Sequence, residues 1–128
     1  MTKKRSFKTK TFSRWMKKTG LKDANLLQAI NEMEDGLIDA DLGGYVYKKR
    51  VALRGIGKRS GARTLVASKC LKRWIFMYGF SKGEQTNIDR DELVYLQETA
   101  KRLLNLNEDE LKTTVTLGEL LELNDYGN

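Results

Sequence analysis

Residues 45–80 read YVYKKRVALRGIGKRSGARTLVASKCLKRWIFMYGF, and this stretch decides the fold. Three short segments within it (45–53, 63–68 and 74–80) are rich in Val, Thr and aromatic residues and are separated by glycine-rich or charged turns. This pattern predicts three β-strands. The third segment, WIFMYGF, is apolar enough to lie in the centre of a sheet. Residues 54–62 are rich in Gly and charge, which predicts a loop.

The flanking sequence predicts helices on both sides of these strands. Residues 5–10 suggest an edge strand, residues 11–18 a helix that ends at Gly20, and residues 23–35 a second helix with leucines and Ile30 at helical spacing. Asp89 is expected to cap a helix that runs to residue 104, Asn107 to cap a shorter helix, and residues 116–123 to form a last one. The order β-α-α-β-β-β-α plus a tail predicts an α+β fold.

The charge of the chain is unevenly distributed. The 128 residues carry 24 Lys and Arg against 17 Asp and Glu, a net charge of +7. Residues 105–128 hold six acidic residues and one basic residue, which leaves 23 basic and 11 acidic residues in residues 1–104. A strongly basic body of this size predicts a polyanionic partner such as RNA, DNA or an acidic protein.

Several classes of site are excluded by composition. The chain has no histidine, which excludes a Ser-His-Asp triad and a His-dependent zinc site, and one cysteine, which excludes an intramolecular disulfide and a cysteine-rich metal site. No apolar run approaches the roughly 20 residues that cross a bilayer. The charged N-terminus is not followed by an apolar region, so it is no secretory signal. We therefore expect a cytoplasmic protein without a membrane partner.

The basic residues of segment 47–63 form the strongest functional signal. They are interrupted by glycines, which let the backbone approach a ligand closely, and comprise Lys48, Lys49, Arg50, Arg54, Lys58, Arg59 and Arg63. Strand alternation places Lys48 and Arg50 on one face, roughly 7 Å apart, which matches adjacent phosphates, and Lys49 on the other face. The alternative is a solvated strand edge followed by a charged loop. The number of charges of one sign favours a nucleic-acid backbone as the partner.

Other candidate residues carry weaker signals. Tyr45, Tyr47 and Tyr78 flank the basic segment and are candidates for a base contact or a proton donor, although core packing is the commoner role. Asp39 and Asp41 lie near a Gly-Gly pair, where turn chemistry is a more common role than metal binding.

The residues of three segments together resemble the RelE/HigB group of bacterial type II toxin–antitoxin toxins. The segments are LGGYVYKKRVALRGIGKRSGARTLVA (42–67), WIFMYGFSKGEQTNI (74–88) and the helical region from KTKTFSRWMKKTGL to LIDADLGG (8–44). The resemblance implies a RelE-like domain over residues 1–104, followed by an acidic C-terminal extension over residues 105–128. It implies two N-terminal helices packed on a small curved antiparallel sheet, with a C-terminal helix and tail.

The resemblance also implies an activity, partners and site residues. The activity is ribosome-dependent cleavage of mRNA with no metal and no cofactor, and the partners are the ribosome, mRNA and a cognate antitoxin, expected to be of the helix-turn-helix type. Position by position, the implied catalytic residues are Lys48, Arg50, Arg63 and Lys82, and the implied RNA-binding residues are Lys49, Arg54, Lys58 and Arg59. The tyrosine that some members carry after the last of these cations has no clear equivalent here, so the resemblance identifies no general base.

Two alternatives to an mRNA endoribonuclease stay open at this point. One is a non-catalytic nucleic-acid or ribosome binder, or a toxin of the ParE branch that acts on DNA gyrase. The other is a purely structural protein without activity.

Overall fold

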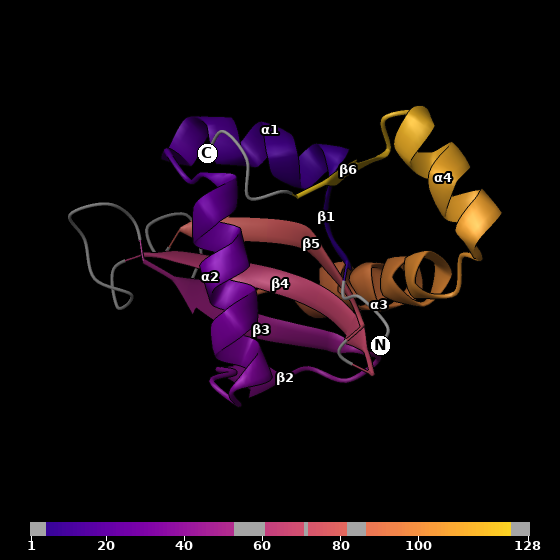
Figure 1. The fold of residues 1–128 in the computed structure, drawn as a ribbon. Coiled ribbons are helices and arrows are strands. Elements are labelled where there is room, and N and C mark those ends of the chain that lie inside the picture. The colour runs from indigo at the N-terminus through magenta and orange to yellow at the C-terminus, as the bar shows by residue number, and fades with distance from the viewer. Residues whose placement is uncertain (1–4, 53–60, 71, 82–86, 124–128) are drawn as a thin grey trace.

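The computed structural model describes residues 5–52, 61–70, 72–81 and 87–123. The chain alternates between strands and helices as the sequence predicts for an α+β fold (Figure 1). In chain order the elements are β1 (Arg5–Thr9), α1 (Lys10–Thr19), α2 (Asp23–Glu34), β2 (Ala40–Asp41), β3 (Val46–Val51), β4 (Ala62–Lys69), β5 (Arg73–Ser81), α3 (Arg90–Leu104), α4 (Glu108–Thr116) and β6 (Leu120–Glu122).

The strands form one six-stranded sheet in the order β2-β3-β4-β5-β1-β6. The predicted strands within residues 45–80 are confirmed, and β5 is an interior strand that pairs with β4 and β1. Two expectations were wrong. The sheet is mixed, because β1 pairs parallel to β5, and β1 is not an edge strand, because it also pairs with β6. Both errors concern pairing between segments that are far apart in the sequence.

Helices cover both faces of the sheet. On one face, α1 and α2 bury Phe12, Leu26 and Ile30 against Val66 and Phe76. On the other face, α3 buries Leu96, Ala100 and Leu103 among side chains that include Leu65 and Ile75. In Figure 1, α2 crosses in front of the sheet and α3 lies behind its right-hand half. The second face is therefore covered by α3 over only part of its length.

Side-chain caps fix the starts of the helices. Asp89 and Asn107 accept hydrogen bonds from the backbone amides of Glu92 and Glu110, at 2.9 and 2.8 Å, so both predicted caps are confirmed. Gly20 ends α1 in the left-handed conformation, with φ of 81°. These local signals explain why the helix positions could be predicted from the sequence.

A β-bulge in β5 decides which side chains reach the second face. Leu65 pairs with Tyr78 but Val66 pairs with Phe76, so Met77 is an extra residue on its strand. One inserted residue reverses the alternation beyond it. As a result Tyr78 lies on the same face of the sheet as Leu65, and Phe76 lies on the opposite face. Gly79 lies on the face of α1, directly against the ring of Trp15.

The acidic C-terminal residues fold against the body of the protein. The helix expected over residues 116–123 was wrong, because Leu120–Glu122 form strand β6 beside β1. Arg5 joins the two parts: its Nη2 lies 2.9 Å from Glu122, and its Nη1 lies 3.3 Å from Glu108. Arg73 donates to the carbonyls of Leu103 and Leu106 at the end of α3. A domain boundary after residue 104 stays a prediction.

Candidate active site

Cations and aromatic rings share the part of the second sheet face that lies beyond α3. Arg50 in β3 stands directly opposite Arg63 in β4, and Arg63 stands opposite Phe80 in β5. In the next row, Lys48 is opposite Leu65, which is opposite Tyr78. Residues two apart on a strand point to the same side, so both rows belong to one surface. We call the surface formed by Lys48, Arg50, Arg63, Tyr78 and Phe80 the cationic face.

Arg63 is the most buried cation of this face. Its exposed fraction is 9%, and its Nη1 donates a hydrogen bond of 3.1 Å to the carbonyl of Gly61. Opposite side chains on an antiparallel pair have Cβ atoms about 4.5–5.5 Å apart, where two like charges are destabilising. Arg63 nevertheless stands directly opposite Arg50. The pairing concentrates positive charge at the junction of β3 and β4.

Asp39 holds Arg50 in place. Its Oδ1 accepts a hydrogen bond of 3.0 Å from Nε of Arg50, and its Oδ2 accepts one of 2.7 Å from the backbone amide of Arg50. The carboxylate offsets part of the repulsion between Arg50 and Arg63. Among the residues that the structure describes, the two Nη groups of Arg50 have no hydrogen-bond partner. These two groups of the planar guanidinium can therefore bind a phosphate at two points.

Lys48 and Tyr78 lie one row further along the sheet. Both side chains are half-buried, and they lie on either side of the buried Leu65 in this row. Within the described ranges Lys48 has no ion pair. The rings of Tyr78 and Phe80 are 6.1 Å apart between centroids, within the range for interacting aromatic side chains.

Lys49 lies on the opposite face of β3, as the alternation predicts. Only 3% of its surface is exposed. Its Nζ lies 2.8 Å from Glu32 in α2 and 2.9 Å from the carbonyl of Leu37. An ammonium in this position joins α2 to the sheet, and we therefore leave Lys49 out of the proposed RNA contacts.

Four of the residues named from the sequence lie outside the described residues. They are Arg54, Lys58, Arg59 and Lys82. The structure brings Lys48, Arg50 and Arg63 together.

Sequence reasoning missed the role of Asp39 and named Tyr78 only as one of three tyrosines that flank the basic segment. Asp39 was considered only for turn chemistry or a metal, and that turn chemistry belongs to Asp41, whose Oδ1 accepts from the amide of Gly43 at 2.9 Å. Asp39 lies in the connection between α2 and β2, directly before β2, and no local pattern links it to Arg50. Tyr78 reaches the cationic face only because of the bulge at Met77, which no local pattern indicated.

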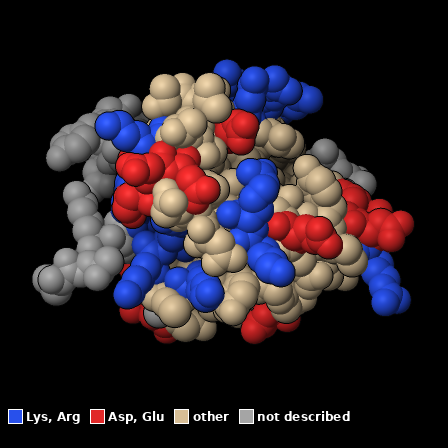
Figure 2. Space-filling view, turned by 90° about the vertical axis from the view of Figure 1, so that its right-hand side faces the viewer, with Lys and Arg blue, Asp and Glu red and all other residues tan. Residues whose placement is uncertain are grey.

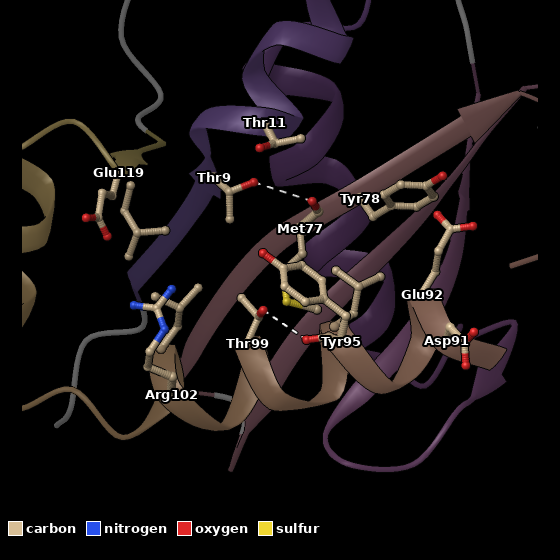
Figure 3. Close-up of a pocket in the computed structure, with 13 residues that line it drawn as sticks. Thr9, Thr11, Met77, Tyr78, Asp91, Glu92, Tyr95, Thr99, Arg102 and Glu119 are labelled. Carbon is tan, nitrogen blue, oxygen red and sulfur yellow. Dashed lines mark hydrogen bonds between the residues drawn. The ribbon is translucent and has the colours of Figure 1, made fainter. Parts of the chain in front are cut away.

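An apolar groove of about 570 Å³ adjoins this face (Figure 3). It runs between α3, β5 and the start of α1, and includes Met77, Leu96 and Leu103. Tyr95 is 70% exposed and projects over the groove from α3, and Tyr78 lies at its far end in the view. The charged residues along it are Asp91, Glu92, Arg102 and Glu119. We call it the apolar groove.

Comparison with known protein families gives a match over almost the whole chain. A family model described as the RelE toxin of the RelE/RelB toxin–antitoxin system matches residues 4–123. No curated protein matches the chain. None of the helices in the described residues is long and apolar enough to cross a membrane. The match covers all of the elements from β1 to β6, including α4 and the strand that follows it.

Proposed function

The chain belongs to the family of RelE toxins of RelE/RelB toxin–antitoxin systems, and from this premise we propose that it cleaves mRNA on the ribosome at the cationic face. As a member of this family it is a toxin with a cognate antitoxin. The observation that carries the proposal is the cross-strand pair of Arg50 and Arg63, held by Asp39 and the Gly61 carbonyl. Two fixed guanidinium groups at one point suit a phosphate whose negative charge increases during reaction.

The proposed reaction needs only the RNA and side chains of the protein. The 2′-oxygen of a ribose attacks the adjacent phosphorus, and the bond from phosphorus to the 5′-oxygen breaks. The products are a 2′,3′-cyclic phosphate and a 5′-hydroxyl, so the proton lost by the 2′-hydroxyl is balanced by the one gained at the 5′-oxygen. The role of the protein is to align the attacking and leaving oxygens and to stabilise the additional negative charge.

The side chains of the cationic face suit different parts of this reaction. Arg63 and Arg50 are proposed to bind the nonbridging oxygens of the scissile phosphate. Lys48 and Tyr78 carry side-chain N–H and O–H groups on this face and are candidates to donate the proton to the 5′-oxygen. Asp39 is proposed to position Arg50, from which both of its oxygens accept hydrogen bonds. Lys82 is proposed as a further catalytic cation, and the basic residues Arg54, Lys58 and Arg59 are proposed to hold neighbouring phosphates.

The test is translation in a cell-free bacterial system with the mRNA ends mapped. The wild-type protein should cut mRNA within codons, and Arg63→Ala should lower the cutting rate by about 10²–10³-fold, the usual effect of removing one fixed donor to a developing charge. Lys112→Ala is a matched control, because Lys112 is an exposed cation in α4. Intact mRNA would contradict the proposal, and blocked DNA supercoiling in the same extract would favour a gyrase-directed toxin.

We further propose that the antitoxin is of the helix-turn-helix type and neutralises the toxin by covering the cationic face with acidic side chains. The charge of residues 1–104, with 23 basic and 11 acidic residues, supports an acidic partner. Reversing the charge of Lys48 and Arg50 together should weaken antitoxin binding in calorimetry, and an unchanged affinity would contradict this docking mode.

A further inference from the structure

A second groove lies at the other end of β3 from the cationic face. The turn before β3, the end of β4 and one flank of α3 enclose a volume of about 780 Å³. Arg50 and Val46 are at opposite ends of β3, roughly 13 Å apart at the usual rise per residue. Side chains that line the groove include Tyr45, Lys69, Gln97, Lys101, Arg102 and Asn105. We call it the basic groove.

The cations of the basic groove are not neutralised by the protein. Lys69, Lys101 and Arg102 are exposed and have no ion pair in the parts of the chain that the structure describes. Several other described cations are held by carboxylates: Arg5, Lys8, Lys49, Arg50 and Arg73. Glu98 is the acidic residue among the groove's lining side chains. Figure 2, which views the right-hand side of Figure 1, shows Lys and Arg side chains interspersed with Asp and Glu over this surface.

Unusual backbone conformations border the same groove. Among the described residues, Tyr45 and Cys70 are the non-glycine residues with positive φ, at 67° and 58°. Tyr45 lines the groove, and Cys70 directly follows Lys69. A bulky residue in the left-handed region costs free energy, and such residues concentrate at binding sites. Glycine would avoid this cost, as it does at Gly43 and Gly44 in the same turn, whose φ angles are 84° and 60°.

The conformation of Tyr45 presents its ring beside a cation. The ring is part of a side chain that is 45% exposed, and Nζ of Lys69 lies 5.4 Å from its centroid. An exposed aromatic ring beside cations is the arrangement with which proteins bind nucleic acids without reading their sequence. The amide side chains of Gln97 and Asn105 add groups of the kind that bind ribose hydroxyls.

The chemistry of this groove differs from that of the apolar groove on the other flank of α3. The apolar groove combines Met77, Leu96 and Leu103 with three carboxylates and with Arg102, which borders both grooves, and this lining suits a protein segment with apolar and basic side chains. The basic groove has Val94 as its aliphatic side chain and three unneutralised cations, which suits a phosphate backbone. Charge complementarity therefore favours RNA over an acidic peptide with an apolar anchor.

We propose that the basic groove binds the backbone of ribosomal RNA while the cationic face holds the mRNA strand that is cut. The inference rests on the proposed function, since it takes the ribosome as the site of action. Val46 is fully buried in one core cluster with Leu96 and Ala100 of α3, so packed apolar side chains lie between the two sites. A second RNA segment, rather than a continuation of the cleaved strand, fits this separation.

The test measures binding of the full chain to vacant ribosomes that carry no mRNA, over a range of salt concentrations. The variant Lys69→Gln with Lys101→Gln removes two cations of the groove. The control Lys17→Gln with Lys112→Gln removes two exposed cations outside both grooves, with the same change in net charge. Thermal unfolding of each variant checks that it is folded.

The groove variant should bind vacant ribosomes more weakly, with a dependence of log K on log salt reduced by about one unit for each lysine removed. The control should keep the wild-type slope, and Arg63→Ala should lose cleavage while it keeps its affinity for vacant ribosomes. Failure of the proposed cleavage would not affect this binding measurement, so the two outcomes are distinguishable. Wild-type affinity and slope in the groove variant would overturn the proposal, as would loss of antitoxin binding with ribosome binding intact.

Discussion

Lys48 and Lys49 are adjacent in the sequence, yet the sheet gives them opposite environments. Lys49 is buried and paired with Glu32, whereas Lys48 is half-buried on the cationic face. Removing one partner of a buried pair leaves an uncompensated charge, so Lys49→Ala should lower the free energy of unfolding by about 3 kcal/mol. Lys48→Ala should change it by no more than ~0.5 kcal/mol.

Urea denaturation of the two variants, together with the cleavage assay, checks this pair of predictions. Lys48→Ala should lose activity at unchanged stability. A large loss of stability in Lys48→Ala, with none in Lys49→Ala, would mean that the two faces of β3 are assigned the wrong way round.

Asp39 acts through Arg50 in this account and is a positioning residue. Without the carboxylate, the Arg50 side chain loses its bond at Nε and faces Arg63 without compensation. Asp39→Ala should therefore lower the rate of cleavage at saturation by about tenfold, or about 1.4 kcal/mol in activation free energy. Asp39→Glu should recover part of the loss.

A double-mutant cycle separates positioning from a general structural effect. If Asp39 acts through Arg50, the variant Asp39→Ala with Arg50→Ala should be no slower than Arg50→Ala alone. Additive losses in the double variant would assign Asp39 an independent role.

At the scale of the elements, α1 and β5 meet at a glycine next to the candidate site. A Cβ at Gly79 would lie 2.3 Å from Cζ3 of Trp15, closer than real atoms approach. Gly79→Ala should thus destabilise the protein by about 1–3 kcal/mol through overpacking. Combining it with Trp15→Leu should recover stability, as measured by denaturant midpoints. If Gly79→Ala is neutral on its own, the ring does not pack on this strand.

Asp89, which caps the start of α3, gives a prediction for how the stability of the fold depends on pH. A hydrogen bond from the Glu92 backbone amide lowers the pKa of Asp89 from its ordinary value, and a hydrogen bond with the Glu92 side chain lowers it further. A lowered folded-state pKa stabilises the fold above the unfolded pKa of about 3.9, and this contribution is lost as the pH falls through the folded value. The wild type should therefore exceed Asp89→Asn in stability at pH 7, and the difference should shrink in acid. A constant difference down to pH 2–3 would show that ionised Asp89 is not responsible.

The elements also show how far the sequence predicts this structure. The helices and the strands within residues 45–80 follow from periodicity and from caps such as Asp89 and Asn107, which act within a few residues. β6 was missed because it forms by pairing with β1, more than one hundred residues away in the chain, and because its three residues carry no periodic signal of their own. The parallel pairing of β1 with β5 was missed for the same reason.

At the scale of the whole molecule, the candidate site was predictable in part. Alternation along β3 assigned Lys48 and Arg50 to one face. The register that puts Arg63 opposite Arg50, and the bulge that turns Tyr78 toward them, depend on how strands pair, which no local pattern determines. The acidic C-terminal residues belong to the same architecture: Glu108 and Glu122 pair with Arg5, so they serve the fold of the family-matched region.

The cationic face and the basic groove give the molecule two positively charged surfaces at opposite ends of β3. In our account the first carries out the chemistry and the second positions the protein on the ribosome. Substitutions in the cationic face should therefore affect mainly the rate of mRNA cleavage. Substitutions in the basic groove should affect mainly the affinity for ribosomes.

The central claim is that the 2′-hydroxyl of the mRNA is the nucleophile, positioned by Arg63 and Arg50. The most direct measurement is the single-turnover rate of cutting of a ribosome-bound mRNA in which the nucleotide before the cut carries a 2′-deoxyribose. We predict normal binding and no cut at that position, with a 2′,3′-cyclic phosphate end in the matched all-ribose mRNA. Cutting of the deoxy-substituted mRNA at the rate of the all-ribose mRNA would contradict the account.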